Sequence, residues 1–325
     1  MSRPEAFVPV ALTSRSQFAE SVHFGAVVAL ERDGSVAFSA GDPAVAIYPR
    51  SANKPLQAVA MVNAGLLLPP GLLALVCASH DGAPMHIEAA RRILATGGLD
   101  ESALLNTADL PLDAASAEVV LRSGGTRTPL QMNCSGKHSG MLATCVVNGW
   151  STETYLDPSH PLQQAISDDL PGLTGERVGH IGVDGCGAPA HVMSLLGLAR
   201  AFRHIAIGAA RDSGASVYRA MTAHPEMVGG SRRDVTQFMQ HVPLLIAKDG
   251  AEGVFAAALP DGRVVALKIA DGANRARPPV MVAALRMLGV DVSIVAPLVR
   301  ERIWGHGHEV GEVSCIAEFR APHDG

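Results

Sequence analysis

One short run of this chain concentrates nucleophilic and metal-binding side chains. Residues 133–138 read Asn-Cys-Ser-Gly-Lys-His, and a second cysteine, Cys186, follows in the run Asp-Gly-Cys-Gly. Two thiolates and a nitrogen donor suit a tetrahedral zinc ion with one open position. Cys134 and Lys137 have the spacing of a Cys-x-x-Cys motif, but lysine must lose its proton before it binds a metal. Spacing alone therefore favours His138 as the third ligand, and the alternative is a pair of buried, inert cysteines.

Lysine is rare in this chain, since only four of its 26 basic residues are lysines. Lysine deprotonates when it is buried and arginine does not, so each lysine is a candidate for a free amine. Ser51 and Lys54 stand three residues apart at the start of a predicted helix, which puts the hydroxyl and the amine on one helix face. A desolvated lysine there would activate the serine, as in Ser-x-x-Lys enzymes. The alternative is a capping serine beside a surface lysine.

A second serine, Ser79, lies at the end of another predicted helix and is followed by His80 and Asp81. The members of a catalytic triad usually converge from distant segments, so this neighbourhood does not indicate a triad, and a turn serine is the alternative. Lys248 and Lys268 each lie at the end of a short apolar run. Either lysine would suit a strand that faces the nucleophile helix, or would be a solvated charge at a sheet edge.

The periodicity of the chain predicts the elements that must position these residues. Apolar, strand-like runs lie near both ends of the chain, at residues 25–30, 35–39, 44–48, 244–247, 254–259 and 264–269. Helical patterns lie mostly between them, at residues 55–65, 72–77, 85–96, 114–122, 139–147, 161–169, 190–223 and 279–288. This order is not the alternation of a parallel sheet. We expect an α+β fold in which the N- and C-terminal strands form one antiparallel sheet, flanked by helices and interrupted by a helical insertion.

Composition limits the possible classes of protein. Hydrophobic residues make up 48% of the chain and charged residues 18%, which is typical of an ordered globular protein, and without a linker or repeat we expect a single domain, 1–325. The net charge of −5, with no basic block, argues against a nucleic-acid partner. The longest apolar run, residues 66–78, is broken by proline and glycine, which argues against a membrane span. Five cysteines and a poor signal-peptide pattern favour the cytoplasm.

Six segments carry a resemblance to a known family: residues 50–55, 77–80, 133–138, 184–186, 224–228 and 268–272. In order and spacing they resemble the class 3 L-asparaginases of the Rhizobium etli type, a family similar in fold to glutaminases and serine β-lactamases. The resemblance implies hydrolysis of the side-chain amide of L-asparagine to L-aspartate and ammonia. It also implies a zinc cofactor and a homodimer.

The resemblance also implies roles for individual residues. The catalytic residues form two Ser-Lys pairs, which favours Lys248 over Lys268: Ser51 with Lys54, and Ser79 with Lys248. The implied zinc ligands are Cys134, Lys137 and Cys186. This leaves three residues beside the zinc ligands or in the substrate pocket: His138, Asp184 and Arg50, whose guanidinium would hold the substrate carboxylate. By analogy with Ser-x-x-Lys enzymes we favour Ser51 as the nucleophile, with Ser79 as a proton relay or as the alternative nucleophile.

Two other interpretations stay open at this point. A glutaminase or a penicillin-recognising serine hydrolase on the same fold would need no metal. A non-catalytic zinc protein would use Cys134 and Cys186 only to clamp two segments together.

Overall fold

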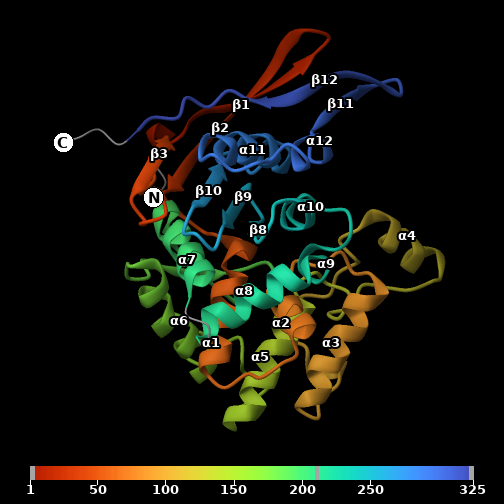
Figure 1. Ribbon diagram of the computed structural model, residues 1–325. Helices are drawn as coiled ribbons and strands as arrows, with labels where there is room; N and C mark the ends of the chain where they lie inside the picture. Colours follow the sequence, from red (N-terminus) through yellow and green to blue (C-terminus); the bar gives the residue numbers. More distant parts are fainter. Residues whose placement is uncertain (1–3, 209–211, 322–325) are drawn as a thin grey trace.

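The main sheet of the protein joins the two ends of the chain (Figure 1). The computed structural model describes residues 4–208 and 212–321. Within them the eight strands of this sheet are antiparallel, in the order β11-β12-β1-β2-β10-β9-β8, with β3 beside β2. The strands are β1 Val8–Arg15, β2 Phe18–Leu30, β3 Val36–Ala40, β8 Ile246–Gly250, β9 Val254–Ala258, β10 Val264–Ile269, β11 Arg302–Gly305 and β12 His308–Cys315. The prediction of one antiparallel sheet built from N- and C-terminal strands is therefore confirmed.

Helices occupy most of the chain between residues 50 and 245, which confirms the predicted helical insertion, and they gather on one side of the sheet (Figure 1). They are α1 Lys54–Asn63, α2 Pro70–Val76, α3 Pro84–Thr96, α4 Ala114–Arg122, α5 Ser135–Asn148, α6 Pro161–Thr174, α7 Leu195–Ile207, α8 Ser213–Ala223, α9 Pro225–Gly229 and α10 Asp234–His241. Two further helices, α11 Arg277–Met287 and α12 Val295–Leu298, lie in the chain between β10 and β11. Short 3₁₀ helices are η1 Pro4–Ala6, η2 Arg50–Asn53, η3 Glu101–Ala103 and η4 Asn274–Ala276. No helix of the described residues is both long and apolar enough to span a lipid bilayer.

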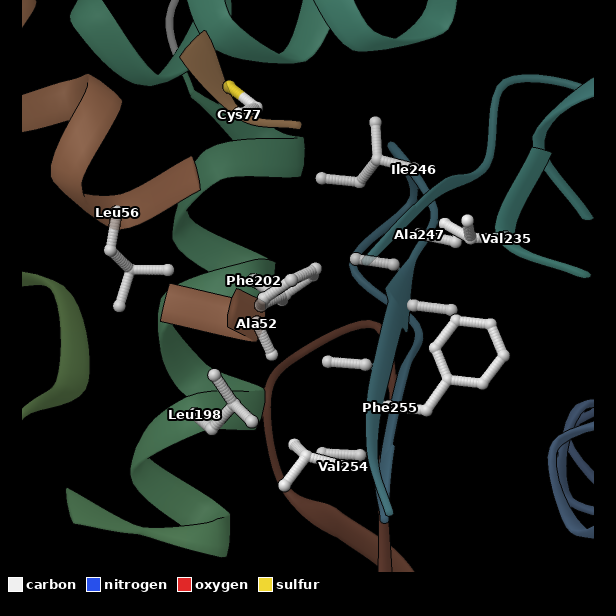
Figure 2. Close-up of a cluster of buried hydrophobic side chains, with 14 of the residues drawn as sticks. Ala52, Leu56, Cys77, Leu198, Phe202, Val235, Ile246, Ala247, Val254 and Phe255 are labelled. Carbon is white, nitrogen blue, oxygen red and sulfur yellow. The ribbon is translucent and has the colours of Figure 1, made fainter. Parts of the chain in front are cut away.

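The centre of the sheet is buried on both faces, which explains the continuous apolar runs in its sequence. Every residue of β9 and the second half of β2 is buried. Helix α7 packs against β2, β9 and β10, and α11 packs against β10 and β12. Figure 2 shows Leu198 and Phe202 of α7 in one cluster with Ile246 of β8 and Val254 of β9, and all four side chains are buried. Strands covered on both sides lose the polar alternation of half-exposed strands.

The sequence analysis missed three strands of the main sheet, β1, β11 and β12. Strand β1 contains Pro9, which cannot donate to a sheet ladder. The β1–β2 register shifts between Pro9 and Ala11, so a bulge accommodates the proline at an exposed position. The strand predicted at 44–48 is only the two-residue β4 (Ala46–Ile47), which pairs with β7 (Met193–Ser194) outside the main sheet. A further small sheet joins β5 (Ile181–Val183) to β6 (Pro189–His191).

Strand β8 continues to Gly250, three residues beyond the predicted run 244–247. At Gly250 the strand passes so close to η2 that an added Cβ would stand 2.3 Å from the carbonyl oxygen of Pro49. Only glycine allows two backbones to approach in this way. This close contact brings Lys248 on β8 next to the start of α1, where Lys54 lies.

Candidate active site

Three of the proposed catalytic side chains meet at one hydroxyl. Ser79 lies in the loop after α2, Lys54 is the first residue of α1, and Lys248 lies in β8. The Nζ atom of Lys248 is 2.9 Å from Ser79 Oγ, and the Nζ atom of Lys54 is 3.2 Å from the same oxygen. All three residues are at most 5% exposed. The fold therefore brings one serine within hydrogen-bonding distance of two buried amines.

The loop that carries Ser79 is fixed by backbone contacts on both sides. The N–H of Ser79 donates to the carbonyl of Val228 (3.0 Å), and the carbonyl of Ser79 accepts a hydrogen bond from Arg233 Nη1 (2.6 Å). Helix α5 packs closely against α2, because an added Cβ at Gly136 would lie 2.4 Å from the carbonyl oxygen of Leu75 in α2. The glycine in the Asn-Cys-Ser-Gly-Lys-His run therefore lets the start of α5 pack directly on the helix that precedes Ser79.

The environment of Lys248 favours the neutral amine. Burial lowers its pKa to about 8, and the positive charge of Lys54 acts in the same direction, while the carboxylate of Asp249 opposes them. Its Nζ also donates to the main-chain oxygen and to Oδ1 of Asp249, both at 2.7 Å. A lysine with a lowered pKa and a hydrogen bond to a serine has the properties of a general base.

Ser51 and Lys54 do not form the hydrogen-bonded pair that their spacing suggested. The Lys54 amine donates to the carbonyl of Ala78 (2.6 Å) and reaches Ser79 instead. Within the described residues the only hydrogen bond between the two is in the backbone, where the N–H of Lys54 donates to the carbonyl of Ser51. The three-residue spacing predicts both side chains on one helix face. The flexible side chain of Lys54 instead reaches the Ala78 carbonyl and the Ser79 hydroxyl, which belong to the loop that packs against it.

Arg50 and Asp184 form an ion pair near Ser51. Both Nε and Nη2 of Arg50 lie 2.8 Å from Asp184 Oδ1, which also accepts the N–H of Gly185 (2.8 Å). Arg50 has a φ of 52°, in the left-handed region that non-glycine residues rarely adopt. Such strain persists where surrounding contacts hold it, often at functional sites.

The predicted zinc ligands also converge. Lys137 Nζ lies 3.2 Å from Cys186 Sγ, and Cys134 and Cys186 belong to one small buried cluster. A hydrogen bond from the Cys134 thiol lowers the pKa of Cys186 and raises that of Cys134, where burial adds to the rise. Burial would lower the pKa of Lys137, but the charges of Cys186 and Cys134 raise it. His138 is also buried, and its Nδ1 lies 2.9 Å from the hydroxyl oxygen of Tyr155.

A cavity of about 220 Å³ connects these groups. Its walls carry both serines, both cysteines and several charged side chains: Arg50, Ser51, Ser79, Cys134, Asp184, Cys186, Arg233, Asp249 and Arg277. Lys54 and Lys248 are buried and do not line the cavity. His138 does not line the cavity, and Lys268 is partly exposed on β10, with its amine bonded to the carbonyls of Ile269 (2.8 Å) and Glu252.

Three charged residues of this site were not predicted: Arg233, Asp249 and Arg277. Nothing in the chain around the two arginines distinguishes them from the other arginines. One signal was available for Asp249, since it directly follows one of only four lysines in the chain.

A serine hydrogen-bonded to two buried amines beside a small polar cavity is the arrangement typical of serine–lysine hydrolases, in which an amine activates a hydroxyl. The sequence profile of the family described as L-asparaginase II matches residues 11–315, so the chain belongs to that family.

Solved structures with a similar chain path are distant. The native form of a protein called Mglu is 14% identical over 81% of this chain and 63% of its own, with a TM-score of 0.45, so this chain spans less than two thirds of Mglu. A β-lactamase from Mycobacterium bovis is 15% identical over 81% and 94% (TM-score 0.37), and a putative β-lactamase from Bacteroides dorei is 16% identical over 81% and 92% (TM-score 0.43). No curated protein matches the chain in sequence.

Proposed function

We propose that the protein hydrolyses the side-chain amide of L-asparagine to L-aspartate and ammonia. The observation that carries the proposal is the Ser79 hydroxyl, 2.9 Å from Lys248 Nζ and 3.2 Å from Lys54 Nζ at the wall of a cavity. Membership of the L-asparaginase II family supports asparagine as the substrate. The cavity, about 220 Å³, is below the roughly 300–1,000 Å³ typical of pockets for larger ligands, which suits a molecule the size of an amino acid.

Lys248 is the proposed general base. When its amine is neutral, its two N–H groups serve the two oxygens of Asp249, and its lone pair faces the hydroxyl of Ser79. Ser79 Oγ then attacks the amide carbon as its proton passes to Lys248. Lys248 returns this proton to the leaving nitrogen, so ammonia departs and an aspartyl ester remains on Ser79. Water hydrolyses the ester in the same way, with Lys248 taking its proton and returning it to Ser79.

Lys54 has a different proposed role. It donates to the carbonyl of Ala78 and faces Ser79 Oγ, so an ammonium at this position stabilises the oxygen while it loses its proton. Its charge also helps to lower the pKa of Lys248. The two lysines thus divide the work, one as a base and the other as a fixed positive charge.

Ser51 is the alternative attacking group. It lines the same cavity, and the strained backbone of Arg50 directly precedes it. In that arrangement Ser79 would pass the proton of Ser51 to Lys248. The hydrogen bonds support direct attack by Ser79, because nucleophile, base and the group that orients the base are already in contact.

The Arg50–Asp184 pair is the proposed site for the two charged ends of the amino acid. A guanidinium suits the substrate α-carboxylate and a carboxylate suits its α-ammonium group. Both residues line the cavity that holds Ser79, and neither is fully buried. Substrate binding would exchange their mutual ion pair for contacts with the zwitterion.

The proposed zinc site consists of Cys134, Lys137 and Cys186. No group of three or more His, Cys, Asp or Glu side chains suitable for a metal occurs within the described residues, and the proposed site includes the lysine. Two thiolates and one amine fit zinc if the metal replaces the proton that Lys137 now shares with Cys186. Zinc bound there would supply a Lewis acid beside the cavity, where Cys134 and Cys186 form part of the wall.

The test measures ammonia release from L-asparagine and L-glutamine, and hydrolysis of a β-lactam, by the wild type and Lys248→Met. We expect the highest kcat/KM with asparagine and a loss of at least about 10³-fold in the variant. Lys268→Met is the matched control, because Lys268 lies on the next strand but one and outside the cavity, and its rate should stay within about twofold of the wild type. Equal rates for wild type and Lys248→Met would refute the mechanism. A higher kcat/KM for the β-lactam or for glutamine than for asparagine would mean that the same mechanism acts on that substrate instead.

A further inference from the structure

Asp249 accepts hydrogen bonds from three cationic side chains. Its Oδ1 accepts from Lys248 Nζ at 2.7 Å. Its Oδ2 accepts from Arg277 Nη1 at 3.2 Å and from Arg233 Nη2. Burial would raise the pKa of Asp249, but these three positive charges hold it well below its usual range. The carboxylate is therefore charged and buried. One of its oxygens accepts from a lysine, and the other accepts from two arginines.

This division matters because a lone carboxylate would keep Lys248 protonated. An opposite charge at hydrogen-bonding distance favours the ammonium form, and in a buried site the effect is large. The two guanidinium groups lie on the far oxygen of the same carboxylate, and arginine stays charged at every relevant pH. They compensate the negative charge without touching the lysine.

We propose that Arg233 and Arg277 are positioning residues that balance the charge of Asp249, so that Lys248 can give up its proton and accept that of Ser79. The inference rests on the proposed function of Lys248 as the base. It also explains why a residue that opposes deprotonation stands next to that base. Asp249 orients the amine through two hydrogen bonds, and the arginines cancel the electrostatic cost of that orientation.

The other charged or titratable groups around Lys248 are few. Lys54 approaches from the start of α1, and the buried thiol of Cys77 lies on the α2 side, where the charges of both lysines act on it. Burial is the main reason that the pKa of Lys248 falls to about 8, with Lys54 and Arg233 contributing and Asp249 opposing. Removal of one arginine should therefore raise that pKa, and neutralisation of Asp249 should lower it.

Arg277 offers the cleaner variant of the two arginines. Arg233 also donates to the carbonyl of Ser79, so its removal would move the nucleophile loop. Arg277 instead contacts the carbonyl of Gly250 (3.1 Å) and Asp234 Oδ2 (3.3 Å), away from Ser79. In Arg277→Met the carboxylate of Asp249 keeps two cationic partners, and the partly exposed Asp234 loses its contact with Arg277 but keeps the N–H of Val235.

The experiment measures kcat/KM for asparagine against pH, and in parallel the ¹⁵Nζ NMR signal of Lys248 in lysine-labelled protein. Only four lysines give signals, and Lys248→Met assigns the relevant one. We expect the midpoint of the pH profile to move up by roughly one pH unit in Arg277→Met. Below the midpoint this shift corresponds to a roughly tenfold loss of kcat/KM, which should recover at high pH. Arg277→Lys keeps the charge and should keep the midpoint, and Asp249→Asn should move it down.

A purely structural role would lower the rate at every pH and leave the midpoint in place. Unmoved midpoints in Arg277→Met and Asp249→Asn would overturn the proposal. If one variant does not fold, the direction in which the midpoint of the other variant moves decides the question. The NMR titration needs no activity. If the wild type releases no ammonia from asparagine while the Lys248 signal moves as expected, the proposed function fails and the charge balance stands.

Discussion

Replacement of Ser79 by alanine should abolish amide hydrolysis and leave the protein folded. Ser79 Oγ is the oxygen that both Lys54 and Lys248 reach, at 3.2 and 2.9 Å. Its removal takes away two hydrogen bonds to charged or basic groups, each worth roughly 1.5–3 kcal/mol. Lys248 keeps its two contacts with Asp249 and Lys54 keeps the carbonyl of Ala78, so we expect a net loss of about 2 kcal/mol.

A loss of this size lowers Tm by only a few degrees in a chain of this length, so thermal unfolding should show a folded variant. Loss of the attacking group should reduce kcat by at least about 10⁴-fold. Ser51→Ala is the matched control, since Ser51 lines the same cavity, whereas the Lys54 amine donates to Ala78 and Ser79. Its kcat should fall by no more than about tenfold.

The covalent intermediate locates the attacking oxygen directly. An acid quench during turnover of asparagine should trap an aspartyl ester, which mass spectrometry can assign. Trypsin does not cleave before Pro55, so one peptide, residues 51–91, carries both serines, and its fragment ions must distinguish them. An ester on Ser51, or a Ser79→Ala variant that retains near-normal kcat, would refute direct attack by Ser79 and support the relay in which Ser51 attacks.

Three further predictions follow from the same geometry. The kcat/KM for asparagine should rise with pH to a plateau, with a midpoint near 8, because Lys248 must lose its proton before it acts as a base; a flat profile from pH 6 to 10 would contradict this role. Cys134→Ser should lose bound zinc in metal analysis of purified protein, whereas Cys315→Ser, on a strand far along the chain from the site, should keep it; equal zinc contents would exclude the proposed ligands. Gly250→Ala should cost about 1–3 kcal/mol and lower kcat, because its Cβ would press on a backbone carbonyl 2.3 Å away, while Gly172→Ala, in open space on a helix, should be stabilising by about 0.5–1 kcal/mol in denaturant unfolding.

Much of the fold was predictable because its signals are local. The hairpin of residues 25–30 and 35–39, and the strands at 254–259 and 264–269, carry apolar runs bounded by turn residues. The antiparallel sheet followed from their positions at the two ends of the chain. Strand β1 could not be predicted in the same way, since Pro9 breaks its pattern and only the bulge beside it, formed against β2, makes the proline acceptable.

Chemistry and spacing in the sequence determined which residues could act in this protein. The rarity of lysine made all four lysines candidates, and only the family resemblance favoured Lys248 over Lys268. The Cys134 run indicated a metal site. The candidate lysines and the metal site follow from residue type, because the tendencies of lysine to deprotonate and of thiolates to bind zinc are properties of the side chains themselves.

The tertiary structure alone decided which of these groups touch one another. Spacing joined Lys54 to Ser51, but packing of the loop after α2 against α1 gives its amine the Ala78 carbonyl and the hydroxyl of Ser79. The charge balance at Asp249 depends on Arg233 and Arg277, from segments that meet only when the sheet and helices assemble. Local sequence cannot encode such contacts, because a long side chain and a buried charge take their partners from whatever segment the fold packs against them.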